Sequence, residues 1–442
     1  MPVPIEVEVY IDDVKLESFY DLKITEKMGD HATFELLVNN DTLKKARGNE
    51  NPLENSQTFL NKSIQIQTLI QDRNNHYKPL RFFGIVVQVA QSIGFRNEAH
   101  DKSKISGFGA SIVLDDGPHM DSFDEMALSE IIDEVTRHYQ HPLLKVNIAP
   151  ERDITIPYTV QQMESGFEYL KRMAANYGEY LCYAEDTLHF GKPDFEEVVL
   201  IEAEDLIEYR IGLNPQSQNF KYYASDYKKE ETVTSDSTRV NTSNAYLHNL
   251  ANNASQELYG HSSIRQQQVL ADNTQQALDT LAELQHKVIE QQQVSVQGVS
   301  DNPGVGLGKP LSIQSREGNE LSYRVSQVTH TFRDMFHYQN EFTAISRDID
   351  IYPHTDINLA PQGSPEIATV TDTSDIAGIS RIRVQYAWQK TTGKKTPWIR
   401  MATPYAGAGR GMHFIPEIGD QVVTGYELNN KNLPYVQSAL YT

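Results

Sequence analysis

Apolar and polar residues alternate near the N-terminus of the chain. Ile5, Val7 and Val9 alternate with glutamates, and residues 64–67 alternate isoleucine with glutamine. A period of two places successive side chains on opposite faces of a strand, so this pattern predicts half-buried β-strands. The run 81–87 is more apolar and predicts a central strand. Many short strands with polar turns between them are typical of a closed or nearly closed barrel.

A different period appears after residue 164 and predicts a helix. Ser165 and Glu168 have the spacing of a capping box, in which each side chain bonds to the backbone N–H of the other residue. The apolar positions that follow share one helix face: Phe167, Leu170, Ala174 and Tyr177. Lys171 and Arg172 are predicted to point into solvent, and Gly178 to end the helix in the left-handed conformation.

The helix is followed by a predicted hairpin. Residues 180–183 and 188–190 are short β-prone runs, and residues 184–187 between them suit a tight turn. The segment from 154 to 193 is therefore predicted as a strand, a helix and a hairpin.

Two further segments have helical periodicity. Ser122 and Glu125 predict a capped helix over 122–139, with an apolar stripe that runs through Leu128, Ile131, Ile132, Val135 and Tyr139. Asn273 and Gln276 cap a predicted helix over 273–292, whose apolar side carries Ala277, Leu281, Leu284 and Val288.

These elements divide the chain into five predicted parts, because 442 residues exceed the size of a single core. The fold class is mainly β with α+β insertions. Within the second half, residues 228–256 are polar and predict a surface excursion with loose local structure. The parts are a first β-barrel-like domain (1–100), an α+β segment (101–200), a second β-barrel-like domain with a long helix (201–350), a linker (351–375) and a C-terminal OB-like barrel (376–442).

Charge and cysteine content narrow the class of protein. The formal net charge of −21 and the isoelectric point near 5.1 argue against nucleic acid or an anionic membrane as partner, since both require a basic surface. A single cysteine, Cys182, excludes intramolecular disulfides and multi-cysteine metal sites, and it is predicted to be a buried small apolar residue. No signal peptide and no apolar run of membrane-spanning length is visible, so a soluble protein made in the cytoplasm is expected.

Three motifs resemble metal- or phosphate-binding sites, but their spacing indicates structural roles. Residues 114–119 contain two aspartates and a histidine but lack the spacing of a calcium loop, so a turn is predicted. His138 and His141 are followed at once by Pro142, which breaks helical geometry and disfavours a metal pair. The glycine-rich stretch 304–310 misses the phosphate-loop spacing and predicts a turn before a strand.

The search for catalytic constellations finds no nucleophile elbow, no zinc-protease pair and no cysteine–histidine motif around Cys182. The prediction is therefore no enzyme, with no catalytic, cofactor-binding or metal-binding residues and no cofactor. Two alternatives stay open. A hydrolase that acts on cell-wall glycan needs just two carboxylates across a cleft. An OB-fold nucleic-acid-binding protein is suggested by basic residues near aromatic ones, namely Lys390, Lys394, Lys395, Trp388 and Trp398.

Two stretches carry a family resemblance. The order of residue types over 154–193, ITIPYTVQQMESGFEYLKRMAANYGEYLCYAEDTLHFGKP, resembles the hub segment of VgrG and phage gp27-like spike proteins of contractile injection systems. Three segments near the C-terminus are similar to the OB-like domain of VgrG and phage gp5 spikes: RIRVQYAW, PWIRMATPYAGAGRGMHFIPEIGDQVV and LPYVQSALY. The resemblance implies two gp27-like barrel domains followed by a gp5-like OB barrel.

The resemblance also implies a function and partners. Members of this family form homotrimers that adapt a hexameric tube to the puncturing needle of a type VI secretion system or a related phage-tail-like particle. The expected partners are the hexameric tube protein, baseplate proteins, a needle-tip (PAAR-like) protein and effectors, with no nucleic acid and no stable membrane anchor. Cytoplasmic assembly and export by the injection machine without a signal peptide are expected. Phe414 and Ile415 are candidates for an exposed apolar interface, or for the barrel core.

Overall fold

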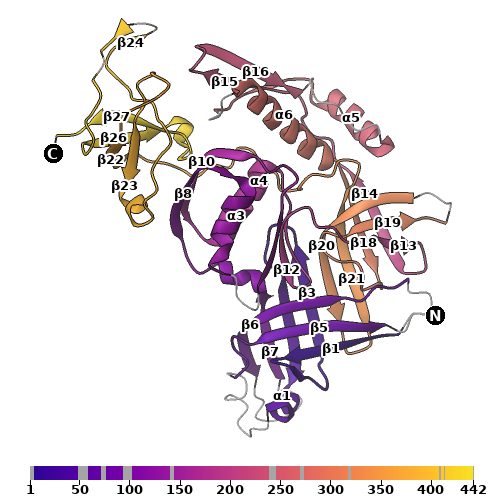
Figure 1. Ribbon diagram of the computed structural model, residues 1–442. Coiled ribbons are helices and arrows are strands. Elements are labelled where there is room, and N and C mark those ends of the chain that lie inside the picture. The colour runs from indigo at the N-terminus through magenta and orange to yellow at the C-terminus, as the bar shows by residue number, and fades with distance from the viewer. Residues whose placement is uncertain are drawn as a thin grey trace.

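A computed structural model of the protein describes residues 4–47, 58–70, 76–92, 102–139, 144–237, 245–268, 273–316, 320–407, 410–412 and 414–441. Its centre is a curled sheet of thirteen strands, in the order β14-β18-β21-β20-β3-β4-β7-β6-β5-β1-β2, with β13 and β19 attached through β20. The curled sheet and its insertions confirm the mainly β fold with α+β insertions (Figure 1).

The N-terminal half of the sheet follows the alternation in the sequence. In β1, Ile5, Val7, Val9 and Ile11 are buried while the residues between them are partly exposed. The elements of this half are β1 (Ile5–Ile11), β2 (Val14–Lys15), β3 (Asp21–Lys27), β4 (Thr33–Asn39), α1 (Asn40–Arg47), β5 (Ser63–Ile70), β6 (Arg81–Ser92), β7 (Lys102–Gly109) and the 3-10 helix η2 (Ala110–Leu114).

The other half of the sheet comes from residues about two hundred positions further along the chain. It contains β13 (Val198–Ile201), β14 (Leu206–Leu213), β18 (Val294–Ser300), β19 (Pro310–Gln314), β20 (Glu320–Phe332) and β21 (Tyr338–Ser346). The halves join where β3 pairs antiparallel with β20, from Lys27 opposite Gln327 to Leu22 opposite Phe332. The ranges 1–100 and 201–350 therefore share one hydrogen-bonded sheet.

The segment that follows η2 packs against the first core. It contains β8 (His119–Ala127), α3 (Leu128–Arg137), β9 (Lys145–Ala149), β10 (Thr155–Glu164), α4 (Gly166–Tyr177), β11 (Leu181–Ala184) and β12 (Thr187–Gly191). The predicted capping box is confirmed: the Ser165 hydroxyl accepts the Glu168 N–H, and the Glu168 carboxylate accepts the Ser165 N–H. Gly178 ends α4 with φ of 72°, and β11 and β12 form the predicted hairpin.

Two predictions in this segment are wrong. Arg172 does not point into solvent, because its side chain is 7% exposed and its guanidinium bonds to Glu164 and to the Val160 carbonyl. The second predicted helix begins at Leu128 rather than Ser122. Residues 119–127 pair with β10 as a strand, and the Ala127 N–H is capped by Glu130 instead. The apolar stripe from Leu128 to Val135 is buried as predicted.

The second half of the chain also contains a small α/β unit. Its elements are β15 (Phe220–Asp226), β16 (Glu231–Asp236), α5 (Tyr246–Leu258), β17 (Ser263–Gln266) and α6 (Thr274–Gln291). Asn273 caps α6 as predicted by accepting the Gln276 N–H. The prediction of loose structure over 228–256 is wrong for β16 and α5. Buried Val233, Ala251 and Asn252 anchor these elements despite the polar composition of the segment.

The C-terminal barrel contains β22 (Glu366–Asp372), β23 (Arg383–Tyr386), η4 (Ala387–Thr391), β24 (Ala406–Gly407), β25 (Arg410–Gly411), β26 (Gln421–Tyr426), η5 (Glu427–Asn429) and β27 (Pro434–Ala439). Four strands form the sheet β23-β22-β26-β27. Residues 399–402 close it, because Ile399 exchanges two backbone bonds with Ile382 beside β23, and Ala402 N–H bonds to Val436 of β27 at 2.7 Å.

This barrel begins earlier than the sequence predicted. The range 351–375 was predicted as a linker, yet residues 366–372 form the strand between β23 and β26. Its prolines lie outside β22, and Ala368 and Val370 bury into the barrel core. Of the two apolar interface candidates, Phe414 is 73% exposed and Ile415 packs against that core.

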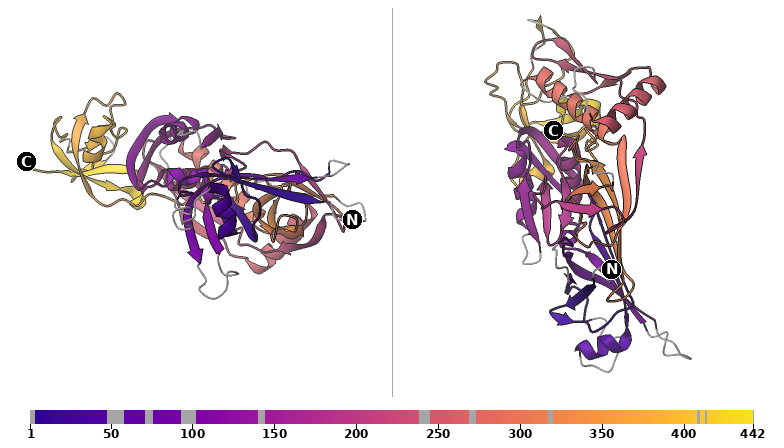
Figure 2. Two further views of the ribbon diagram at one scale, coloured as in Figure 1. Left: turned by 90° about the horizontal axis from the view of Figure 1, so that it is seen from below. Right: turned by 90° about the vertical axis from the view of Figure 1, so that its right-hand side faces the viewer.

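The barrel lies at one end of an elongated molecule. Figure 2 shows it next to the segment with β8 and β10, and away from the N-terminal strands. The barrel contacts β8, β10 and α3, and Arg400 also lies 4.2 Å from the centre of the Tyr227 ring.

Candidate functional site at the junction with the C-terminal barrel

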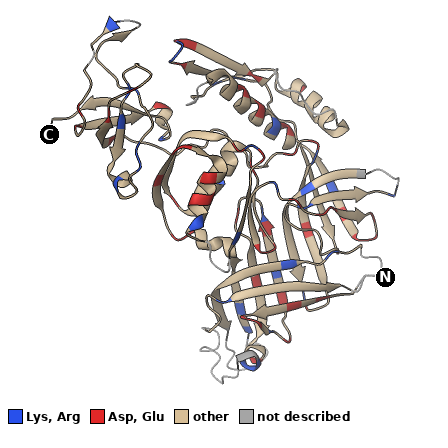
Figure 3. Ribbon diagram, in the orientation of Figure 1, with Lys and Arg blue, Asp and Glu red and all other residues tan. Residues whose placement is uncertain are grey.

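Lys394 connects the barrel to the segment containing α3. Its Nζ donates to Asp121 of β8 at 2.8 Å and to Glu134 of α3 at 2.7 Å, and it lies 4.2 Å from the centre of the Phe123 ring. Figure 3 shows acidic residues along α3, which carries Glu134. One lysine therefore bridges two elements across the junction.

Gln389 makes a fully buried contact beside this lysine. Its amide Nε2 donates to the Ser122 hydroxyl at 2.7 Å, and its Oε1 accepts the Tyr386 N–H at 3.0 Å. A buried amide left without partners would cost about 1 to 3 kcal/mol, so Gln389 fixes the position of η4 on β8.

Two further contacts extend the junction. The Asn432 side-chain oxygen accepts the Val160 N–H of β10 at 2.9 Å. Arg383 lies 3.7 Å from Asp124 of β8. Burial raises the pKa of Asp124, although Arg383 opposes the shift. The junction is therefore polar and is distributed over both strands of the antiparallel β8–β10 pair.

Glu366 fixes the point at which the chain enters the barrel. Its carboxylate accepts bonds from Trp388 Nε1 at 2.8 Å and Tyr426 OH at 3.1 Å, and it pairs with the buried Lys431 at 2.9 Å. Trp388 also stacks on Tyr386, with ring planes 7° apart. These contacts hold the first residue of β22 against η4, the end of β26 and the loop before β27.

A second ionic network joins β20 to Asp350, which follows β21 in the sequence. Arg324 of β20 binds Asp350 through two nitrogens, at 3.1 and 3.0 Å, and Tyr180 OH donates to the same carboxylate at 2.6 Å. Lys192 is also paired with Asp350. Burial alone would raise the pKa of Asp350, but the bonds from Arg324 and Lys192 outweigh it and lower that pKa to about 2.

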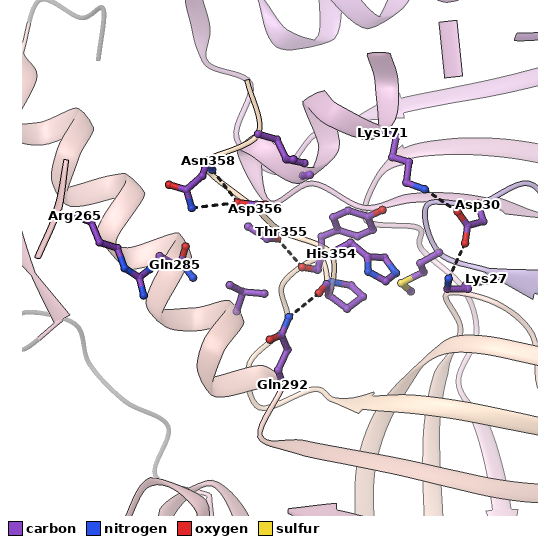
Figure 4. A pocket seen from close by; sticks show the side chains of 16 residues that line it. Lys27, Asp30, Lys171, Arg265, Gln285, Gln292, His354, Thr355, Asp356 and Asn358 are labelled. Atoms are coloured by element: carbon purple, nitrogen blue, oxygen red, sulfur yellow. Dashed lines mark hydrogen bonds and ion pairs between the residues drawn. The ribbon is translucent and has the colours of Figure 1, made fainter. Parts of the chain in front are cut away.

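A cavity of about 580 Å³ separates α4 from α6 (Figure 4). Lys27 and Lys171 both pair with Asp30 at its wall, each at 2.8 Å. His354 also lines the cavity, and burial together with these lysines lowers its pKa. The cations of the wall that lie next to Asp30 are therefore paired within the chain.

The motifs weighed from the sequence are engaged in local structure. Asp115 pairs with His31 at 2.9 Å, and Asp116 with His119 at 2.7 Å. His138 is the residue at the C-terminal end of α3, and His141 lies outside the described residues. Residues 304–310 form the turn that precedes β19, with Gly308 N–H bonded to Val325.

The two alternative functions gain no support from the geometry. Trp388 stacks on Tyr386 and bonds to Glu366, Arg383 lies 5.2 Å from the centre of the Trp398 ring, and two carboxylates neutralise Lys394. Among the described residues, the carboxyl groups with raised pKa are Asp124, Glu179 and Asp301, which burial affects most. None of the three lines a described cavity.

Within the described ranges, no cluster of three or more histidine, cysteine or acidic residues is arranged to hold a metal ion. The helices of those ranges also include none long and apolar enough to cross a membrane. Cys182 is buried as predicted, and burial raises the pKa of its thiol to about 12.

Sequence reasoning missed the residues that form the junction. Lys394 was weighed as part of a possible nucleic-acid-binding cluster, and Gln389, Asp121 and Glu134 carried no local signal. A polar residue that pairs across 250 positions of sequence has no distinctive neighbours, so no local pattern identifies it.

Comparisons with known proteins agree with this architecture. Residues 55–335 match the phage tail baseplate hub (GPD) family, and residues 366–441 match the type VI secretion system/phage-baseplate injector OB domain. A comparison with curated protein sequences finds no match.

Solved structures share the fold at low sequence identity. The Escherichia coli c3393 protein, a component of the type VI secretion system with similarity to T4 bacteriophage gp27 and gp5, is 12% identical with a TM-score of 0.61, over 98% of this chain and 99% of that chain. VgrG in a Francisella PdpA–VgrG complex is 10% identical with a TM-score of 0.56, over 100% and 79%. The Neisseria meningitidis MC58 tail protein is 12% identical with a TM-score of 0.55, over 78% and 97%.

A hub sheet followed by an OB-like barrel defines a structural spike and hub protein of contractile injection systems. The chain belongs to the phage tail baseplate hub family, because that family matches more than half of its length. The resemblance to VgrG and to gp27-like and gp5-like spike proteins is confirmed.

Proposed function

We propose that three copies of this chain form a ring that adapts a hexameric tube to a threefold puncturing spike. The single observation that carries this proposal is that a baseplate-hub match and an injector OB match follow one another in one chain. Closed cyclic assembly is common for such subunits. In this view the protein turns over no substrate and acts by transmitting force.

The junction supports the mechanical part of the proposal. A load applied to the barrel passes into β8, β10 and α3 through Gln389, Lys394 and Asn432. Because these contacts lie on separate elements, the barrel resists rotation about any single bond. A rigid link of this kind transmits displacement from the large sheet to the spike base.

The partners beyond the trimer are also part of the proposal. The tube protein, other baseplate proteins, a needle-tip protein and effectors are expected to bind, and the PdpA–VgrG complex of the Francisella relative supports the binding of a further protein by a chain with this fold. Assembly in the cytoplasm before export by the machine belongs to the same proposal and is tested by fractionating producing cells.

Native mass spectrometry of the chain, alone and with its tube and tip proteins, tests the assembly. The expected species contains three 50.1-kDa chains, about 150 kDa in all. Particle imaging of the complete machine supplies the copy number independently. A single copy per particle, or turnover of peptidoglycan that one carboxylate substitution abolishes, would overturn the proposal.

A further inference from the structure

The helix α5 is attached to the rest of the chain by a polar face. Its buried side chains are His248, Ala251, Asn252 and Ser255, which share one side of the helix. Most helices in folded proteins are held by an apolar face that packs against a core. In α5 only Ala251 is both apolar and buried, and among the described residues none of its side chains belongs to a hydrophobic cluster. Polar contacts therefore decide whether α5 stays docked.

The larger apolar side chains of α5 point away from this face. Tyr246 is 75% exposed, Leu250 41% and Leu258 65%. Figure 1 shows α5 on the outer side of the small α/β unit, next to α6. The hydrophobic effect therefore contributes little to the docking of α5.

The polar contacts converge on the C-terminal end of α6. The Asn252 side-chain amide donates to the Glu290 carboxylate at 2.9 Å, and its oxygen accepts a bond from Gln218. One turn further along α5, the Ser255 hydroxyl accepts a bond from the Gln293 amide at 2.8 Å. All of these residues are buried, so a contact that is lost without access to water leaves an unpaired polar group.

Two buried histidines flank Glu290. His248 of α5 is fully buried and forms a hydrogen bond with the Glu290 backbone. His286 of α6 lies one turn before Glu290, with its Nε2 3.7 Å from the carboxylate. Neither ring nitrogen of His286 has a hydrogen-bond partner among the residues that the structure describes. Because His248 and Asn252 both belong to α5 and both contact Glu290, α5 covers this turn of α6.

Burial keeps both histidines neutral. Glu290 faces both of them, and Asp348, which follows β21, also faces His248. These carboxylates raise the pKa of the imidazoles, but burial outweighs them and lowers both pKa values from the ordinary 6.5. His248 also lines a cavity of about 800 Å³, whose other charged residues are Glu202, Arg316 and Asp348. Each histidine is therefore uncharged in the docked structure at pH 7.

We propose that α5 is a pH-sensitive helix that stays docked on α6 while His248 and His286 are neutral and detaches when mild acid charges them. Detachment brings water to this turn of α6, where both imidazolium rings are then solvated. The rest of the α/β unit keeps its own apolar core, formed by β15, β16 and α6, and stays folded. Local opening of this kind is typical of segments with few buried apolar contacts.

Proton binding favours the detached helix. A histidine whose pKa is lower in the docked form contributes to docking above pH 6.5, and that contribution is lost as the pH falls below 6.5. At pH 6, a ring that stays neutral when docked and titrates at about 6.5 when free lowers the docking constant about fourfold. Two such rings lower it about sixteenfold.

Hydrogen–deuterium exchange of the full chain at pH 8 and pH 6, corrected for the intrinsic exchange rate at each pH, tests the proposal. Both pH values lie above the isoelectric point near 5.1, so the chain keeps a net negative charge. Protection of residues 246–258 is expected to fall about tenfold from pH 8 to pH 6. Protection of β15, in the core of the same unit, is expected to stay unchanged.

Substitution of the histidines identifies the groups that titrate. His248→Gln and His286→Gln are each expected to reduce the pH effect, and the double variant is expected to remove it, because glutamine stays neutral at both pH values. His261→Gln is the matched control, since His261 is exposed and lies outside α5, and it should behave as the parent chain does. If the double variant is already detached at pH 8, the single variants decide through the size of their pH effect.

Three results would overturn the proposal. The first is constant protection of α5 in the parent chain, or a full pH effect in both single variants. The second is an equal loss of protection in β15 and α5, which would show that the whole unit opens. The third is protection of α5 that follows protein concentration rather than pH, which would assign its stability to contacts between copies.

Discussion

Lys394 Nζ lies 2.7 Å from Glu134 Oε1, although 260 residues separate the two in the sequence. The pair joins the C-terminal barrel to α3 at the edge of the junction, and both side chains keep partial contact with solvent. Its role is to hold the two units in one orientation rather than to stabilise either core.

Lys394→Ala should weaken the junction by about 1 kcal/mol, since a partly exposed ion pair contributes modestly. The barrel core does not include Lys394, so the barrel itself should stay folded. Limited proteolysis should then cut the stretch between Ile357 and Glu366 faster than in the parent chain. Lys390→Ala, at an exposed residue of η4, is the control and should leave the rate unchanged. Equal cleavage rates for the parent and Lys394→Ala would show that the pair does not hold the barrel.

Arg172→Ala should destabilise the chain far more than Lys171→Ala. Arg172 is buried and paired with Glu164, and removal of one partner from a buried pair costs about 3 to 5 kcal/mol. Lys171 pairs with Asp30 at the surface, where the loss is about 1 kcal/mol or less. Urea unfolding of the two variants measures the difference. Similar midpoints would contradict the burial of Arg172.

Acid should weaken the network around Asp350. The folded-state pKa of Asp350 is lowered to about 2 from an ordinary value of 3.8, so the ionised form is bound more tightly in the folded chain. Its contribution, about 2 kcal/mol, is complete above pH 3.8 and is lost as the pH falls toward 2. The Asp350→Asn variant should be less stable than the parent at pH 7, with the gap closing near pH 2. A gap that stays constant in thermal unfolding from pH 7 to pH 2 would refute this assignment.

Cys182 should be unreactive in the folded chain. Burial raises the pKa of its thiol to about 12, so almost none is present as the reactive thiolate at pH 8. Ellman's reagent should react with less than about one tenth of the thiol in native protein over an hour, and fully in urea. Rapid labelling without denaturant would show that the β11–β12 hairpin opens.

Local signals in the sequence determined several elements in detail. The Ser165–Glu168 box, the Asn273 cap and the glycine at 178 specify helix ends through bonds between residues three or four positions apart. The alternation in β1 and β5 specifies which side chains face the core. Each of these signals is complete within about a dozen residues, and for that reason each was predicted correctly.

Other features were decided only when distant segments met. The Ser122–Glu125 spacing suited a helix, but this stretch pairs antiparallel with β10 and is the strand β8. Arg172 lies on a helix with an amphipathic sequence pattern, at a position predicted to face solvent. Its side chain is instead buried, where it pairs with Glu164 of the preceding strand.

The sequence by itself determined a mainly β chain with capped helices, an acidic surface and a family likeness at two places. The tertiary structure alone decided that β3 and β20 unite the two halves in one sheet, that residues 399–402 close the barrel, and that Lys394 and Gln389 fix the barrel on β8 and α3. The physical reason is that strand pairing and buried polar contacts depend on which surfaces meet. No local sequence signal identifies the distant partner of a strand edge or of a side-chain amide.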